Sequence, residues 1–183
     1  MAETTTQFNE RNQEQMPVVI GLDLGTSSTK VVVQTPYFVE SRALLIPFKQ
    51  FAHPSNQYLL PSKVSIDSRC VYSLEEKNAE IVFEDLKIRL LSNDLTTTKF
   101  RINALDDYFI SSKELATAYL ALVLQFVRKW FLQTQERILS EYRLSWQLNI
   151  GIPTLGYDDK KEIQLFRETA QKACLSSSNK CDF

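Results

Sequence analysis

Residues 18–33, with the sequence VVIGLDLGTSSTKVVV, constrain the fold of this chain more than any other segment. Two runs rich in β-branched residues flank a short stretch of glycine, threonine and serine, which is the pattern of two strands joined by a tight turn. Gly25 can adopt backbone angles that are closed to other residues, so the turn can direct several backbone N–H groups toward one anion. Hydroxyl donors beside those amides come from Thr26, Ser27 and Ser28. The segment therefore predicts a β-hairpin whose turn binds phosphate.

Asp23 ends the otherwise apolar first strand, and a carboxylate at a buried strand end needs a partner. Because Mg²⁺ is bound by one or two carboxylates together with substrate phosphates, Asp23 is the predicted magnesium ligand. The segment is not a helix-opening P-loop, since no G-x-x-x-x-G-K-[ST] follows and the turn leads into a strand. The hydroxyl residues would also suit an ordinary turn. Their combination with Gly25 and Asp23 favours phosphate binding.

Length and composition place modest limits on the class of protein and on its partners. The chain has 183 residues, enough for one domain with a core. Its charged residues nearly cancel to a formal net charge of −1, which does not indicate binding to nucleic acid or to an anionic membrane. The most apolar stretch, residues 115–132, is interrupted by Gln125, Arg128 and Lys129, whereas a membrane span needs about 20 apolar residues. We expect no nucleic-acid partner and no membrane partner.

Residues 1–16 are polar and lack the apolar core of a secretory signal, so we expect a disordered tail. The cysteines have neither CxxC spacing nor an even count, which favours reduced thiols over disulfides or a zinc site; they are Cys70, Cys174 and Cys181. The single histidine, His53, is expected to be an exposed loop residue before Pro54. Together these features favour a cytoplasmic protein.

The rest of the pattern predicts strands first and long helices later. Strands are expected at residues 18–23, 29–34, 41–48, 60–66, 70–74 and 146–153. Capping-box sequences start two expected helices, one over residues 113–139 after Ser111 and one after Asp159. The apolar stripe of the first helix is expected to be core and comprises Leu115, Tyr119, Leu122, Phe126, Trp130 and Ile138, with Ala118, Val123, Val127 and Phe131 beside it. This order of elements is typical of an α/β fold.

The hairpin at residues 18–33 resembles the first phosphate motif of the superfamily that joins actin, the seventy-kilodalton heat-shock chaperones and sugar kinases. Residues 60–64 (LPSKV) are similar to the P-S-x-V segment of the chaperone ATPases, and residues 111–116 (SSKELA) to their P-E-E-I/L-S/A helix start. Residues 151–161 (GIPTLGYDDKK) resemble their V-P-A-x-F strand end with its D-x-Q-R helix start. The resemblance covers roughly residues 17–174 in the same order.

This resemblance implies a ribonuclease H-like lobe with a small inserted subdomain at about residues 49–110, and it implies ATP and Mg²⁺ as cofactors. It also implies a lysine on the smaller subdomain that reaches the transferred phosphate and positions the attacking water. Residues 81–91 resemble the segment that carries it, so Lys87 is the candidate catalytic cation beside Asp23, with Arg89 as the second choice. A mobile cation there would offset charge on the γ-phosphoryl oxygens. Both residues would equally suit the polar face of a short amphipathic helix.

The family's second phosphate loop, of the Asp-x-Gly-Gly-Gly-Thr type, is not present in this sequence, which has four glycines: Gly21, Gly25, Gly151 and Gly156. The lobe is therefore expected to be incomplete, as the first half of a larger ATPase. The expected partners are ATP or ADP, a second polypeptide that completes the ATPase, and a client or co-chaperone protein. A noncatalytic protein-interaction module is the alternative from another class. A sugar kinase fragment ranks below it, because sugar kinases do not usually carry the P-S-x-V segment.

Overall fold

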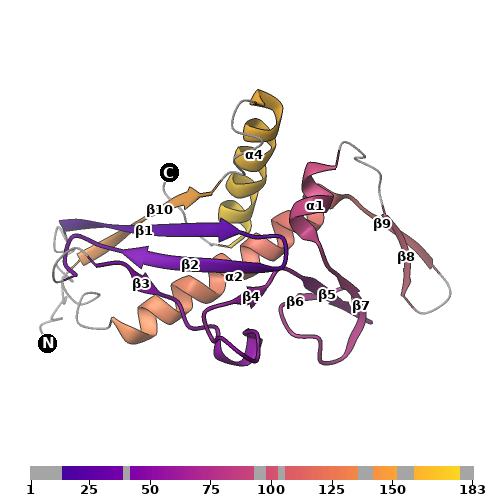
Figure 1. The fold of residues 1–183 in the computed structure, drawn as a ribbon, viewed down its shortest axis with the longest axis horizontal. Helices are drawn as coiled ribbons and strands as arrows, with labels where there is room; N and C mark the ends of the chain where they lie inside the picture. Colours follow the sequence, from indigo (N-terminus) through magenta and orange to yellow (C-terminus); the bar gives the residue numbers. More distant parts are fainter. Residues whose placement is uncertain are drawn as a thin grey trace, which may run out of the picture.

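The computed structural model describes residues 14–38, 42–92, 98–102, 106–135, 142–151 and 159–177. The predicted hairpin forms the centre of its main sheet: β1 (Glu14–Leu24) and β2 (Ser28–Gln34) pair antiparallel, with Leu24 opposite Thr29 (Figure 1). The strand order is β10–β1–β2–β3, and β4 also pairs with β2. The added strands are β10 (Tyr142–Ile150), which runs parallel to β1, β3 (Leu44–Leu45) and β4 (Leu60–Pro61). Strands and helices thus mix in one fold, and the expected α/β class is confirmed.

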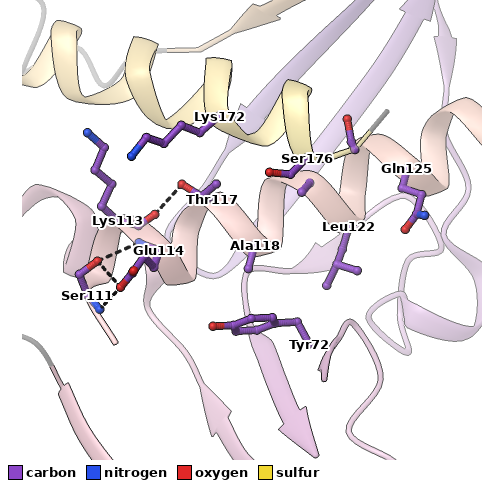
Figure 2. A pocket seen from close by; sticks show the side chains of 12 residues that line it. Tyr72, Ser111, Lys113, Glu114, Thr117, Ala118, Leu122, Gln125, Lys172 and Ser176 are labelled. Atoms are coloured by element: carbon purple, nitrogen blue, oxygen red, sulfur yellow. Dashed lines mark hydrogen bonds between the residues drawn. The ribbon is translucent and has the colours of Figure 1, made fainter. Parts of the chain in front are cut away.

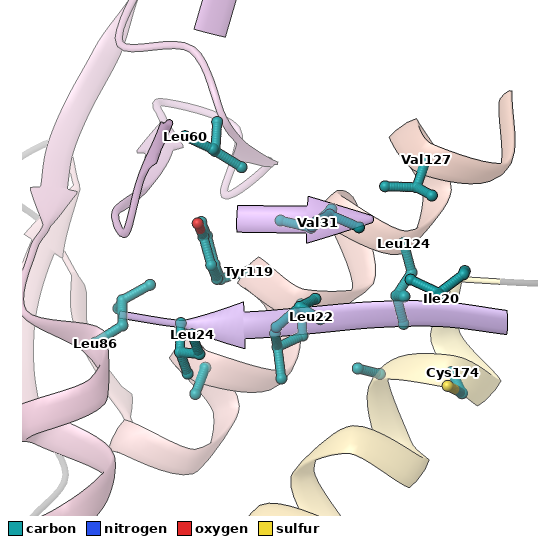
Figure 3. Packing of buried hydrophobic residues seen from close by; sticks show 14 of the residues in the cluster. Ile20, Leu22, Leu24, Val31, Leu60, Leu86, Tyr119, Leu124, Val127 and Cys174 are labelled. Atoms are coloured by element: carbon teal, nitrogen blue, oxygen red, sulfur yellow. The ribbon is translucent and has the colours of Figure 1, made fainter. Parts of the chain in front are cut away.

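One face of the main sheet is apolar because β1 alternates strictly. Every second residue is at most 3% exposed: Met16, Val18, Ile20, Leu22 and Leu24. These side chains point toward the long helix α2 (Ser112–Thr134), as Figure 3 shows for Leu22 and Tyr119. Burial of each such side chain stabilises the fold by roughly 1.5–3 kcal/mol, so the period of two in β1 fixes which face lies against the helices.

Helix α2 begins with the predicted capping box. The Ser111 hydroxyl accepts a hydrogen bond from the Glu114 N–H at 3.1 Å, and the Glu114 carboxylate accepts one from the Ser111 N–H at 2.8 Å. The buried stripe is rotated from the expected one, because Leu122, Phe126 and Trp130 are only half-buried. The buried side chains are Ser112, Leu115, Ala116, Tyr119, Leu120, Val123, Leu124, Val127 and Phe131.

By length and composition, α2 is the one helix in the described part of the chain that could cross a membrane. Its position in this fold accounts for the same apolar character, since it packs against β1, α1 and the second long helix. The second long helix, α4 (Lys160–Ser176), begins where Asp159 accepts hydrogen bonds from the N–H groups of Lys161 and Glu162. An ion pair between Lys113 and Glu168 joins the two helices.

The segment between β4 and α2 forms smaller units. A three-stranded sheet has the order β6–β5–β7, from β5 (Val64–Asp67), β6 (Tyr72–Ser73) and β7 (Ala79–Phe83). The short helix α1 (Leu86–Leu91) follows, and then the hairpin of β8 (Thr98–Ile102) and β9 (Asp106–Ile110), which extends away from the main sheet in Figure 1. A 3-10 turn, η2 (Lys49–Phe51), precedes β4.

Several boundaries differ from the expected ones. Strand β1 begins at Glu14, so residues 14–16 belong to the sheet and not to a tail, while residues 1–13 lie outside the described residues. The strand expected at residues 41–48 is reduced to Leu44–Leu45. The strand expected at residues 60–66 is divided between two sheets, since Leu60–Pro61 pairs with β2 and Val64–Asp67 pairs with β6 and β7. Helix α2 ends at Thr134, and residues 136–139 lie outside the described residues.

The capping box makes stability depend on pH. Hydrogen bonds from the Ser111 backbone N–H and hydroxyl hold the pKa of Glu114 below its ordinary value. A carboxylate with a lowered pKa in the folded state contributes stability above its unfolded pKa and loses it as the pH falls through the folded value. We expect Glu114→Gln to cost about 0.3–1 kcal/mol at pH 7, the usual worth of a charge at a helix N-terminus. In urea titrations the difference in unfolding free energy between the two proteins should narrow as the pH falls below the ordinary pKa of a glutamate; a difference that is constant with pH would contradict this.

Candidate functional site

The turn between β1 and β2 needs Gly25 for a reason that the sequence did not indicate. The φ angle of Gly25 is not positive, so the expected special backbone angle is wrong. Instead, a Cβ at this position would lie 2.3 Å from the carbonyl oxygen of Ser28. Real Cβ atoms do not approach a backbone oxygen so closely, and the partner here is backbone that cannot rotate away. Glycine is therefore required by the close approach of the two arms of the turn.

A cavity of about 520 Å³ lies beside this turn. The turn is at the end of the main sheet nearer to β5–β7 and α1 (Figure 1). The cavity therefore lies where the main sheet meets the smaller one. Its polar wall includes the hydroxyl residues of the turn and the start of the next segment: Thr26, Ser27, Ser28, Ser62 and Lys63. The predicted phosphate-binding hydroxyls are thus brought together on one concave surface.

The segment Pro61-Ser62-Lys63 is held against the turn by hydrogen bonds. The Ser62 N–H donates to the carbonyl oxygen of Ser27 at 3.0 Å. The hydroxyl oxygens of Ser62 and Thr29 lie 3.0 Å apart, and the Tyr119 hydroxyl donates to the carbonyl oxygen of Pro61 at 3.2 Å. Thr29, Ser62 and Tyr119 are all buried, so these polar groups satisfy one another away from water. Burial raises the pKa of the Tyr119 hydroxyl above its ordinary value, which keeps it a donor.

Lys63 supplies the positive charge on the described cavity wall. Its side chain is 26% exposed and forms an ion pair with Glu76, whose side chain is 53% exposed. The same wall carries two exposed carboxylates, Glu84 and Asp85. An anion entering the cavity would meet one lysine and two acidic groups, so a divalent cation that accompanies the anion would reduce the repulsion.

Asp23 is not among the residues that line the cavity. It is exposed, on the face of β1 opposite the core, so the premise that it is a buried carboxylate in need of a partner is wrong. Its Oδ1 lies 3.7 Å from the position that a Cβ on Gly151 would take, and Lys30 is opposite it on β2. In the described residues no group of three or more His, Cys, Asp or Glu side chains could hold a metal ion. Asp23 would therefore bind magnesium only together with water and phosphate oxygens.

The two candidate cations on α1 are not on the cavity wall. Lys87 is half-buried on this helix and is not among the residues that line the cavity. Arg89 donates from Nε to the carbonyl oxygen of Glu84 at 2.8 Å, and its guanidinium lies 6.0 Å from the centre of the Phe83 ring. These contacts of Arg89 thus stabilise the connection between β7 and α1. A role for Lys87 at the phosphate would need a movement of α1 toward the turn.

The sequence interpretation missed Ser62, Lys63 and Tyr119 as parts of this site. The signal was present for Ser62 and Lys63, because they belong to the P-S-x-V-like segment, but no pattern placed them beside the turn. Tyr119 matched an apolar stripe, and its hydroxyl partners come from segments 58 and 90 residues earlier in the chain. His53 is exposed as expected, yet it also lines the cavity and its Nδ1 lies 2.7 Å from the Ser55 hydroxyl oxygen.

A second hollow of similar size, about 540 Å³, lies between α2, α4 and β6 (Figure 2). Its polar groups already serve the fold: Glu114 caps α2, Lys113 pairs with Glu168, and Thr117 donates to the carbonyl oxygen of Lys113 at 2.7 Å. The cavity at the turn, with five hydroxyl residues and Lys63, has the stronger chemistry for an anion.

No protein-family model and no curated protein matches the sequence.

Proposed function

We propose that this chain binds the phosphates of ATP with Mg²⁺ at the β1–β2 turn. In this proposal it is the N-terminal part of a heat-shock chaperone-like ATPase, built on a ribonuclease H-like lobe, and it hydrolyses ATP only when a second lobe completes the site. Asp23 and Lys87 are the catalytic residues, and Gly25, Thr26, Ser27 and Ser28 bind phosphate.

Support comes from the meeting of separate motifs at one end of the main sheet. The Ser62 N–H bonds to Ser27, which joins the P-S-x-V-like segment to the phosphate turn. The Gly151 N–H donates to the carbonyl oxygen of Leu22 at 2.8 Å, which brings the end of β10 beside Asp23. These segments are far apart in the sequence, and each was related to the chaperone ATPases for its own residues.

The strand order also suits the proposed lobe. Three antiparallel strands come first, and β10 pairs parallel to β1 after the helix α2. The carboxyl ends of β1 and β10 therefore lie side by side, as the register of Leu22 with Ile150 shows. Ligands of α/β sheets bind outside the carboxyl ends of parallel strands, which is where Asp23 and the turn lie.

The chain's own residues would divide the work of binding. Hydroxyl groups of Thr26, Ser27 and Ser28 would donate to phosphate oxygens, and Lys63 would leave its exposed ion pair with Glu76 to add a charge-assisted hydrogen bond. Asp23 would hold magnesium through water, and magnesium when bound supplies charge neutralisation at the phosphates. The half-buried Lys87 would approach the terminal phosphate only after closure of the smaller subdomain.

Binding of Mg-ATP by the variant Lys63→Met tests this site. We expect binding weaker by about tenfold or more, because a hydrogen bond to a charged group contributes roughly 1.5–3 kcal/mol. Lys160→Met is the matched control, since Lys160 is an exposed lysine at the start of α4, and its binding should equal that of the unsubstituted chain. Calorimetry or ligand-observed NMR at high ATP concentration provides the measurement. Inorganic triphosphate should compete with ATP, and adenosine should not.

Two results would overturn the proposal. One is equal binding by the Lys63→Met and Lys160→Met variants, and the other is competition by adenosine as strong as that by triphosphate. Absence of nucleotide binding in any mixture would favour the second candidate, a noncatalytic interaction module on the same fold. The observation that favours this candidate is the partly uncovered apolar face of β10, where all five inward residues are only half-buried.

A further inference from the structure

Strand β10 is an edge of the main sheet. It pairs with β1 on one side, and in the described part of the chain no strand pairs with its other side. The hydrogen bond from the Gly151 N–H to Leu22 shows which residues bond to β1. Backbone groups alternate along a strand, so the odd-numbered residues direct theirs to β1 and the even-numbered ones direct theirs outward. In the part of the chain that the structure describes, the outward N–H and C=O groups of this edge have no strand partner; they belong to Tyr142, Leu144, Trp146, Leu148 and Ile150.

The same five residues carry the apolar side chains of β10. The register places Trp146 opposite Val18, Leu148 opposite Ile20 and Ile150 opposite Leu22, so they share the face that packs on α2. From Met16 to Leu24, the β1 residues of this face are at most 3% exposed, whereas all five from β10 are half-buried. Helix α4 does not close over them.

A groove of about 480 Å³ remains between β10 and α4. Its floor includes Trp146, Leu148 and Ile150, and its wall includes Ile163 and Phe166 from α4. A long edge strand with outward hydrogen-bonding groups beside an apolar groove is a template for another strand. The added strand would extend the sheet and place alternate side chains in the groove.

We propose that the strand added to this edge is β10 of a second copy, paired antiparallel about a two-fold axis at Trp146. In this register Trp146 faces its own copy, Leu144 faces Leu148 of the other chain, and Tyr142 faces Ile150. The five pairs have outward backbone groups, and each exchanges two hydrogen bonds. The total number of hydrogen bonds matches that of a typical protein interface, about ten.

The sequence of β10 is self-complementary in this register. Because the strand has nine residues and alternates apolar and polar about Trp146, a rotation about the axis brings apolar residues opposite apolar ones. On the other face Arg143 meets Asn149 and Ser145 meets Gln147, so no like charges meet. The formal net charge of −1 gives two copies little reason to repel each other. A closed two-fold dimer uses the edge of each copy completely, and no edge remains at β10 for further growth.

This dimer does not depend on nucleotide binding, so the two proposals can fail separately. Sedimentation velocity of the full chain over a range of concentrations should show a reversible monomer–dimer equilibrium. Monomer at every concentration would overturn the inference, as would growth into larger assemblies, because a two-fold edge pairing stops at two copies.

Charge complementation tests the register. Ser145 and Gln147 lie on the polar face of β10, so the double variants Ser145→Lys with Gln147→Lys and Ser145→Glu with Gln147→Glu leave the core unchanged. Each alone places like charges opposite each other across the axis, and we expect each to dimerise at least about tenfold more weakly. Mixing the two should restore a heterodimer. Circular dichroism verifies that both variants are folded.

The controls are Gln34→Lys and Gln34→Glu, which introduce one charge of the same sign at an exposed position on β2, away from the edge. They should dimerise like the unsubstituted chain. Folded double variants that dimerise as the controls do would overturn the inference, and so would a mixture that associates no better than either variant alone.

Discussion

Replacing Gly25 by alanine is expected to lower the free energy of unfolding by about 1–3 kcal/mol, the usual cost of forcing extra atoms into a packed site. The added Cβ would lie 2.3 Å from the Ser28 carbonyl oxygen, so the two arms of the turn must separate. That movement would displace the hydroxyl groups of Thr26 and Ser27 from the cavity wall. If the turn binds phosphate, Mg-ATP affinity should fall by more than about tenfold.

Two other glycines provide graded controls for this substitution. A Cβ on Gly151 would have its nearest neighbour at 3.7 Å, which is ordinary contact, so Gly151→Ala should leave the unfolding free energy nearly unchanged. A Cβ on Gly21 would lie 2.8 Å from a side-chain methyl of Val32, and Gly21→Ala should fall between the two. Urea titrations of all three variants measure their unfolding free energies and so give the order of destabilisation. A Gly25→Ala protein as stable as Gly151→Ala would show that the turn does not need glycine.

The sequence predicted well those elements whose formation depends on residues close together in the chain. Strands β1 and β2 alternate in hydrophobicity, and the turn between them has a composition that few other structures tolerate. The starts of α2 and α4 follow from capping residues that act within three positions, Ser111 with Glu114 and Asp159 with the next turn. Such features depend on neighbours in the chain, so the sequence contains the information directly.

The features that the sequence did not predict depend on tertiary contacts. The periodicity of α2 indicated an apolar helix, but which of its side chains are buried depends on where the sheet and α4 pack against it. Asp23 was expected to be buried because its neighbours are apolar, yet alternation places it on the open face of β1. Ser62 and Lys63 reach the turn because the chain crosses from the main sheet to the smaller one at this point. No local sequence pattern predicts that the chain passes between the two sheets there.

The other large effect concerns hydrolysis: the isolated chain should bind ATP weakly and turn it over far more slowly than a complete ATPase of the proposed class. The cavity offers one turn, five hydroxyl residues and Lys63, and much of a nucleotide bound there would face water. Loss of one preorganised donor commonly costs a factor of about 100 to 1,000, or roughly 3–4 kcal/mol, and under this proposal all groups of the second lobe come from another polypeptide. The assay is magnesium-dependent ATP hydrolysis by the chain alone and after mixing with a candidate second half.

Asp23→Asn is the control for that assay, because Asp23 is exposed and the amide keeps its shape while removing the charge that would hold magnesium. Activity that appears on mixing and is lost in Asp23→Asn would fit a half-site completed by another chain. Rapid hydrolysis by the lone chain, abolished by the same substitution, would contradict the need for a second lobe. Activity that is unchanged in Asp23→Asn would remove Asp23 from the catalytic site, since water and the hydroxyl residues of the turn cannot replace a carboxylate's charge beside a metal ion.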